Sequence, residues 1–167
     1  YPIVAVVSSS MEHQGSFDEW WANSASDYAA FGITKEEFRE YSLKSGFDRG
    51  DIIILRKSSS ENLKNGDVIV YWTKRPDPII HRVVAFDFEK TGFIQTKGDN
   101  YRTNRAQIVH YVDAEGRDAQ KGAPGAIKFH DETEIKKEEV IGKAWIRIPL
   151  LGYVKIFAVE LWNSVRG

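Results

Sequence analysis

Short runs of β-branched and aromatic residues, separated by turn-forming residues, dominate the chain from residue 51 onward. Runs of this kind, with dipeptides such as Asn65-Gly66 between them, are typical of antiparallel strands joined by tight turns. One further apolar run opens the chain. The pattern predicts strands at 3–7, 51–56, 67–72, 78–86, 93–96, 107–112, 125–129 and 140–148. We therefore expect a mainly β fold of twisted antiparallel sheets.

The segment from about 16 to 47 has a different pattern and predicts a small helical insertion. Ser16 is followed three residues later by Glu19, and Thr34 by Glu37, a spacing that marks two helix starts. Apolar side chains share one face of each expected helix: Phe17, Trp20, Trp21, Ala25 and Tyr28 in the first, Phe38 and Tyr41 in the second. We expect these faces to pack on the β core rather than to bind a ligand.

Composition narrows the possible functions. The chain has 167 residues with Lys+Arg 23 against Asp+Glu 24, so its net charge of −1 argues against a nucleic-acid partner. One domain is expected at this length. The count of Cys 0 excludes disulfides, thiolate metal sites and a cysteine nucleophile. Phosphate-loop, dinucleotide and zinc-protease motifs are absent. The four histidines, which lack metal-ligand spacing, are His13, His81, His110 and His130.

The first candidate for chemistry is the run Ser8-Ser9-Ser10, which directly follows the opening apolar run. In an extended chain Ser8 and Ser10 point to the same side, so two hydroxyls can face one carbonyl. A serine needs a base to become a nucleophile, and His81 interrupts an otherwise apolar strand. Asp99 lies in a turn just after another strand and could orient that histidine. Each residue also has an ordinary structural interpretation, as a turn or strand residue.

Five short segments, taken in order, resemble the type I signal peptidases. They are Ser8–Glu12, Gly50–Leu55, Gly66–Val70, Ile80–Val83 and Thr96–Asn100. Residues 141–143 and 148–153 are similar to the closing segment of that family, so the likeness covers nearly the whole chain. Histidine, rather than lysine, at position 81 resembles the archaeal and endoplasmic-reticulum branch. The insertion, with Phe17-Asp18 and Trp20-Trp21, resembles those of archaeal members.

The resemblance implies a serine endopeptidase that cleaves signal peptides from secretory preproteins and needs no cofactor. In this family pattern Ser10 is the nucleophile, His81 is the general base and Asp99 orients the imidazole. The Ser10 backbone N–H and the Ser8 hydroxyl would stabilise the oxyanion.

The resemblance also implies how substrate binds. Family members take the end of a signal sequence as an added strand, with two shallow apolar pockets for small side chains. The positions that match these pockets are Val6, Met11, Ile79 and Ile80. Core packing is an equally good interpretation of each of them, because both roles need apolar residues.

A membrane location follows from the same likeness. The family carries a transmembrane anchor ahead of the serine segment and works on the extracytoplasmic side of the cell membrane. We expect that such an anchor has been removed from this chain, and that a rim at 153–162 rests on lipid. Whether accessory subunits are needed stays open.

One position departs from the family pattern. A second aspartate is expected about six residues after Asp99, and that position is Arg105. The second acid could be dispensable, Asn104 could do part of its work, or a re-registered loop could bring in Asp113. His13, close in sequence to Ser10, is a fallback base.

Three other functions remain to be weighed. A self-cleaving protease of the repressor type would use lysine as its base, and Lys74 or Lys97 would have to serve. A peptide-binding β module would keep the groove without activity. A β domain that serves only as a scaffold is the third.

Overall fold

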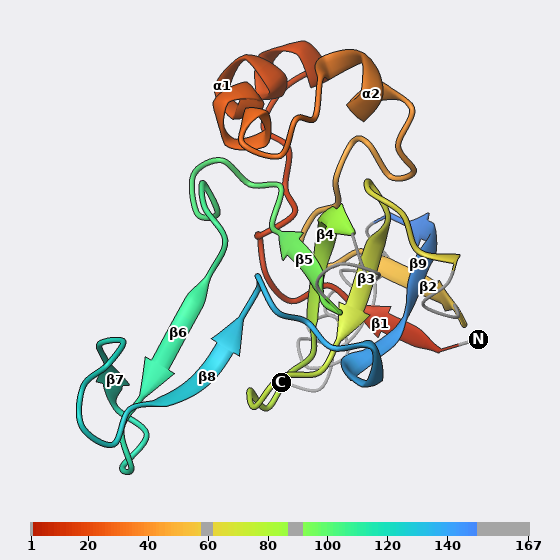
Figure 1. Cartoon of the computed structure of the whole chain (residues 1–167). Helices are drawn as coiled ribbons and strands as arrows, with labels where there is room; N and C mark the ends of the chain where they lie inside the picture. The colour runs from red at the N-terminus through yellow and green to blue at the C-terminus, as the bar shows by residue number, and fades with distance from the viewer. Residues whose placement is uncertain (1, 58–61, 87–91, 150–167) are drawn as a thin grey trace, which may run out of the picture.

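Two antiparallel sheets and a pair of helices carry the described part of the chain (Figure 1). The computed structural model describes residues 2–57, 62–86 and 92–149. The expected rim at 153–162 lies outside these residues. The mainly β fold predicted from the sequence is confirmed.

The larger sheet has six strands in the order β1-β2-β9-β3-β4-β5. Every neighbouring pair in it is antiparallel. The bounds are β1 Ile3–Ala5, β2 Ile52–Arg56, β9 Val140–Ile148, β3 Val68–Tyr71, β4 Ile79–Phe86 and β5 Ile94–Lys97. A single 3-10 turn, Lys137–Glu139, leads into β9.

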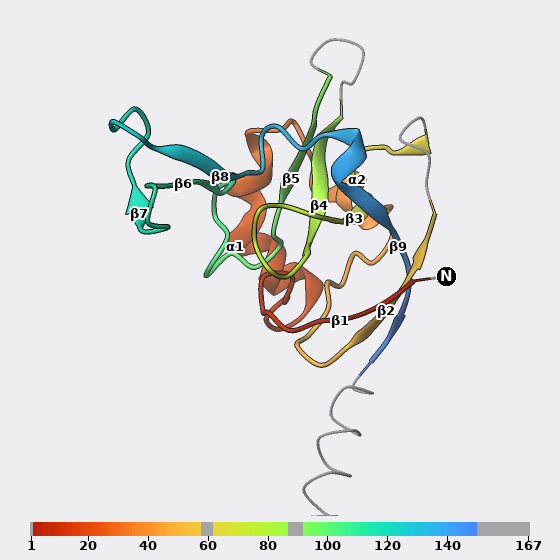
Figure 2. The ribbon, with the colours of Figure 1, turned by 90° about the horizontal axis from the view of Figure 1, so that it is seen from below.

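The smaller sheet has the order β7-β6-β8, with β6 Val109–Val112, β7 Asp118–Ala119 and β8 Ile127–Asp131. It projects away from the side of the larger sheet that carries β1, β2 and β9, as Figures 1 and 2 both show. After β8 the chain returns to the larger sheet: the Thr96 N–H donates to the Glu132 carbonyl, and Ile94 pairs with Ile135. This return brings the end of β8 beside β5.

The helical insertion forms as its capping signals predict. Helix α1, Phe17–Ala29, starts with a capping box between Ser16 and Glu19. Helix α2, Lys35–Arg39, starts at Thr34, whose side chain accepts the Glu37 N–H. The aromatic face packs on the sheet through a cluster of Trp20, Trp21, Tyr28, Ile33 and Phe38 with Val84 of β4. Core packing is therefore the role of this face.

Strand β4 has a packed layer on each of its faces. Residues that alternate along a strand leave on opposite sides, so neighbours such as His81 and Arg82 belong to different layers. On one side lies the cluster of Leu63, Ile69, Tyr71, Val83, Ile94 and Ile135. The other side carries a cluster that includes Val68, Val70, Ile80, Met11 and Phe47.

Within the described ranges, no helix is both long and apolar enough to cross a bilayer.

Candidate active site

A cleft of about 510 Å³ brings together two parts of the chain that are distant in sequence. One wall is the opening strand with the serine run, residues 4–10, and the other is residues 75–81, which lead into β4. Thr103, Asn104 and Ile108 close one end. Ser10 and His81 both line this cleft, so the structure joins the two residues that the sequence singled out as nucleophile and base.

The serine run is held in place by the turn that follows β5. The Ser10 carbonyl accepts the Asn100 N–H at 2.9 Å, and the Asn100 side chain donates to the Ser9 carbonyl at 2.8 Å. A Cβ on Gly98 would lie 2.8 Å from the Ser10 carbonyl oxygen, so only glycine permits this approach. Within the run, the Ser8 and Ser10 hydroxyl oxygens are 3.2 Å apart. Both hydroxyls thus lie on one side of the segment, as the spacing predicts.

The His81 ring is buried, and its Nδ1 is hydrogen-bonded to the carboxylate of Glu132. Glu132 follows β8 and is itself fully buried, with its Oε2 accepting the Ile108 N–H at 2.5 Å. No sequence pattern predicts a functional role for Glu132, because it stands in a charged stretch beside Asp131 and Glu134. Only the return of the chain after β8 brings it to His81.

Asp99 contacts a different set of side chains from the one expected. Its Oδ1 accepts from the Tyr28 hydroxyl at 2.6 Å and from Arg82 Nε at 3.0 Å. Its Oδ2 accepts from Arg82 Nη2 at 2.6 Å and faces His13 Nε2 at 3.0 Å. The acid bonded to His81 is therefore Glu132 rather than Asp99. The physical reason is strand alternation, because Asp99 binds the residue after His81, which leaves β4 on the other face.

The charge of Asp99 is strongly favoured in the fold. Burial by itself raises the pKa of this carboxyl, but the Arg82 guanidinium and the His13 hydrogen bond outweigh burial and hold the pKa well below its usual range. Arg82 is equally buried and also donates to the carbonyls of Ser42, Leu43 and Gly66. This pair ties the insertion to β4 and to the turn that holds Ser10.

His13, the fallback base, belongs to the same cluster. Its ring stacks on Trp20 at 3.6 Å between centroids and meets Asp99 with Nε2. Burial lowers the pKa of His13, and the neighbouring Asp99 opposes that effect. His13 is not among the residues that line the cleft.

Three of the four expected substrate-pocket residues line the cleft, namely Val6, Ile79 and Ile80. Met11 does not. It is fully buried in the core with Phe47, whose N–H donates to the Met11 carbonyl at 3.0 Å. The chain turns inward directly after Ser10, so Met11 fills the core instead of the pocket.

The alternatives for the second acid also separate in space. Asn104 lines the cleft and accepts from the Thr103 hydroxyl at 2.7 Å. Asp113 lies in the exposed turn before β7 and pairs with Arg117. Arg105 is mostly exposed and lies 3.7 Å from Asp27.

Neither candidate lysine for a Ser-Lys site lines the cleft. Lys97 is buried, which lowers its pKa, and its ammonium donates to the Gly98 carbonyl at 2.8 Å. Lys74 donates to the Lys128 carbonyl on the smaller sheet. Over the ranges described, no group of three or more acidic or histidine side chains is arranged to hold a metal ion.

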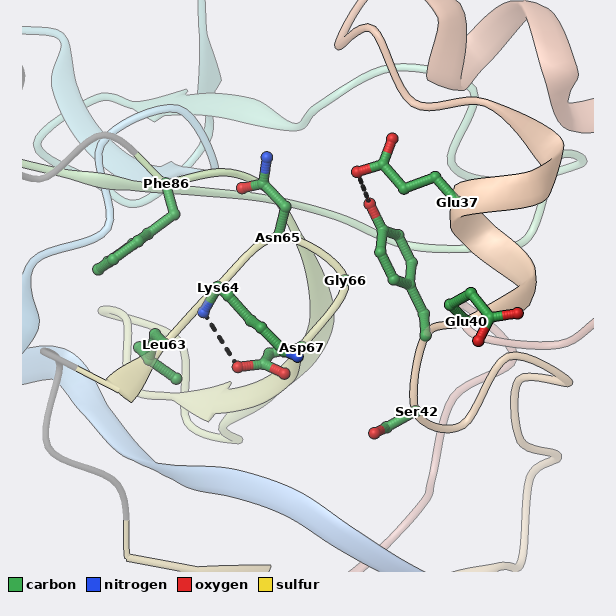
Figure 3. Close-up of a pocket in the computed structure, with 10 residues that line it drawn as sticks. Glu37, Glu40, Ser42, Leu63, Lys64, Asn65, Gly66, Asp67 and Phe86 are labelled. Carbon is green, nitrogen blue, oxygen red and sulfur yellow. Dashed lines mark hydrogen bonds between the residues drawn. The ribbon is translucent and has the colours of Figure 1, made fainter.

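A second cavity, also of about 510 Å³, lies between the end of α2 and the turn before β3 (Figure 3). In it the Tyr41 hydroxyl donates to Glu37 at 2.7 Å, and the Lys64 N–H donates to Asp67. Its lining residues include acids and one serine, Ser42, but no histidine. Of these two cavities, only the first is lined by both a serine and a histidine.

Comparison with known proteins relates the chain to one kind of enzyme subunit. No protein-family model matches it. The signal peptidase complex catalytic subunit SEC11 of Lachancea thermotolerans is 32% identical over 123 residues, which cover 71% of this chain and 62% of that protein. The corresponding subunit of Sclerotinia sclerotiorum is 31% identical over 71% of this chain and 60% of its own length. SEC11C of Canis lupus familiaris is 27% identical over 69% of this chain and 52% of its own length. The chain thus spans between half and two thirds of these relatives.

Proposed function

Because the chain is a homologue of the catalytic subunits of the signal peptidase complex, we propose that it is the catalytic domain of a serine endopeptidase that removes signal peptides from secretory preproteins. One observation carries the proposal. Ser10 and His81 line the same cleft, and the ring of His81 is buried with one nitrogen bonded to a carboxylate.

The cleft supports acyl transfer in two steps. In the first, the Ser10 hydroxyl oxygen attacks the scissile carbonyl while Nε2 of His81 takes the hydroxyl proton. The C–N bond then breaks, and Nε2 passes that proton to the leaving amine, which leaves an acyl ester on Ser10. In the second step, water attacks the ester with His81 again as base. The ester bond breaks and the Ser10 hydroxyl is restored.

The oxyanion that forms in each step needs hydrogen-bond donors. The Ser10 backbone N–H and the Ser8 hydroxyl are the proposed donors, and the 3.2 Å separation of the two serine oxygens supports this role. A single donor of this kind is worth roughly 3 kcal/mol of activation free energy. Removal of the Ser8 hydroxyl therefore affects the rate more than the binding of substrate.

The substrate would bind as an added strand. β1 is an edge strand of the larger sheet. Across the cleft, Ile79 and Ile80 pair with β3, whereas pairing of β4 with β5 begins only at Arg82. The cleft thus lies between two stretches of strand that each have one side open in the described residues. Main-chain bonds to an extended peptide would supply affinity, and the apolar lining favours small apolar side chains.

A membrane setting is the finer part of the proposal. Ile3, Val7 and Trp145 are large apolar residues with 66%, 66% and 50% of their surface exposed. They lie on or next to β1 and β9, two strands in the half of the larger sheet that includes the β1 wall of the cleft. We propose that this side meets lipid in the anchored, full-length enzyme on the extracytoplasmic face of the membrane. Whether accessory subunits are needed stays open. The archaeal type of insertion stays a prediction, because the relatives named above are eukaryotic.

The test is cleavage of a preprotein that carries alanine at the first and third positions before the cut, presented in detergent or lipid. We expect specific cleavage by the parent chain, and its loss in Ser10→Ala and His81→Ala. A chain that binds the peptide without cutting it would support the non-catalytic binding module. Cleavage that survives in Ser10→Ala would exclude this serine as the nucleophile.

A further inference from the structure

The contact between His81 and Glu132 has a chemical consequence. From it, we infer that Glu132 is the positioning residue of the proposed reaction, which holds the imidazole in the tautomer that leaves Nε2 free to take the Ser10 proton. The inference rests on the proposed function, since it concerns the same site. It gives Glu132 the role that the family resemblance implies for Asp99.

Glu132 is fixed by bonds of both its main chain and its side chain. Its N–H donates to the Ile108 carbonyl at 2.9 Å, and its carbonyl accepts the Thr96 N–H at 2.9 Å. The Gln107 side chain donates to the same carbonyl at 3.1 Å. Its Oε2 is occupied by the Ile108 N–H, so Oε1 is left for His81. A carboxylate held this firmly sets the orientation of the ring that it binds.

The bond also sets the position of the proton on the ring. An ionised carboxylate can only accept a hydrogen bond from the ring, so the inferred arrangement has the proton of His81 on Nδ1. Nε2 then holds a lone pair. When Nε2 takes the proton from Ser10, the ring becomes an imidazolium beside the charge of Glu132 in a site of low dielectric. In this scheme Glu132 takes no proton, and the proton from Ser10 is held on Nε2 and leaves from it.

The groups packed around Glu132 do not compete for this role. Burial, followed by the charge of Glu132, raises the pKa of Tyr71 on β3 well above its usual value. Burial lowers the pKa of His130 on β8 to about 4. Both rings are therefore neutral near pH 7. Lys97 on β5 gives its ammonium hydrogen bond to Gly98. The Tyr71 hydroxyl also contacts the Glu132 carboxylate, but as a neutral group outside the cleft. His81 is thus the partner of Glu132 that lines the cleft with Ser10.

The acid in the loop after β5 is Asp99, which bonds Arg82, and residues 100–108 supply no second acid that would duplicate Glu132. Where the resemblance calls for a second aspartate the chain has Arg105, which is exposed and directed to Asp27. The acid reaches His81 from another segment of the chain, after β8. The structure thus accounts for the departure in sequence without a re-registered loop.

The experiment compares Glu132→Gln with Glu132→Asp in the cleavage assay. We expect Glu132→Gln to lower kcat by about 10³–10⁴-fold with little change in KM, as for other misoriented catalytic histidines. Glu132→Asp keeps the charge and restores part of the rate. Melting curves of both variants are needed to check that they are folded at the assay temperature.

The matched control is Glu134→Gln, two residues further on, where an exposed carboxylate pairs with Lys128 at 2.6 Å. We expect Glu134→Gln to leave kcat unchanged. A folded Glu132→Gln within threefold of the parent rate, or one whose slower rate is not partly restored in Glu132→Asp, would overturn the inference. If Ser10→Ala and His81→Ala abolish cleavage and Glu132→Gln does not, this inference fails alone.

A second readout does not depend on turnover. In the inert Ser10→Ala chain, ¹⁵N NMR of the His81 ring is expected to show the tautomer with the proton on Nδ1. Adding Glu132→Gln converts it to a mixture or to the other tautomer. An unchanged ring would contradict the inference even if the parent chain cleaves nothing, because the tautomer reports the Glu132 contact directly.

Discussion

His81 and Arg82 are neighbours on β4, and each contacts a buried carboxylate on its own face of the strand. Asp99 accepts hydrogen bonds from three side chains, and its main partner is a guanidinium that keeps its charge at every working pH. Glu132 divides its oxygens between the His81 ring and one backbone N–H. One strand thus carries a permanent ion pair on one side and a titratable pair on the other.

The two pairs are suited to different roles, one to the stability of the fold and the other to chemistry in the cleft. A buried charge with a permanent partner cannot change its state without a large cost in folding free energy, so the Asp99 cluster suits the joining of segments. A buried carboxylate whose histidine partner lines a cleft can stabilise the positive charge that forms on the imidazole during a reaction. The motif that resembles the family is thus present in the sequence, but its acid, Asp99, contacts Arg82 rather than His81.

The largest effect that would test this contrast is on stability. We expect Asp99→Asn to lower the free energy of unfolding by about 3–5 kcal/mol, because it leaves the Arg82 guanidinium buried without a counter-charge. Urea unfolding at pH 7 measures the change. The control is Asp18→Asn, the same substitution at an exposed ion pair with Lys35, where a much smaller change is expected because solvent screens the pair.

The outcome that would reverse the comparison is specific. If Asp99→Asn unfolds at the parent urea concentration but cleaves orders of magnitude more slowly, then Asp99 is the acid that serves His81. Glu132 would in that case be the structural residue, and the two faces of β4 would exchange roles.

A smaller effect is expected from pH on the Glu132 side. The pKa of His130 is lowered by burial to about 4, and neither ring nitrogen has a hydrogen-bond partner among the described residues. A histidine whose pKa is lower in the folded chain takes up its proton on unfolding. The stability is therefore complete above about pH 6.5 and falls as the pH drops toward 4.

His130→Phe removes this loss and keeps a ring to stack on Tyr71. We expect the variant to gain a few degrees in Tm over the parent at pH 5, and less at pH 7.5. Thermal unfolding at the two pH values measures the difference. An equal shift at both values would mean that packing alone, and not titration, sets the effect.

Much of the fold could be predicted because it depends on local signals. Among the described residues, the strand runs predicted all but one strand to within a few residues at each end, and the two hydroxyl caps predicted where both helices begin. The missed strand, β7, has two residues and no apolar run to mark it. It forms only because the turn after Asp113 folds back on β6.

The site was predicted only in part, for a physical reason. Ser10 and His81 carry local signs, a strand end and a polar ring in an apolar strand, and both line the cleft. The carboxylate that contacts His81 carries no such sign, because this contact depends on which face of β4 the carboxylate meets. Asp99 has the motif but reaches the face of Arg82. Glu132 has no motif and reaches His81 through the return of the chain after β8.

The smallest expected effect concerns the position that departs from the family. Arg105 is 62% exposed and its nitrogen lies 3.7 Å from Asp27, so Arg105→Ala is expected to change the free energy of unfolding by less than about 0.5 kcal/mol. Cleavage is expected to stay at the parent rate, because His81 takes its acid from another segment. Urea unfolding and the cleavage assay measure both quantities. A large loss of rate in a stable Arg105→Ala chain would mean that the loop after β5 acts on His81, and it would weaken the division between the two faces of β4.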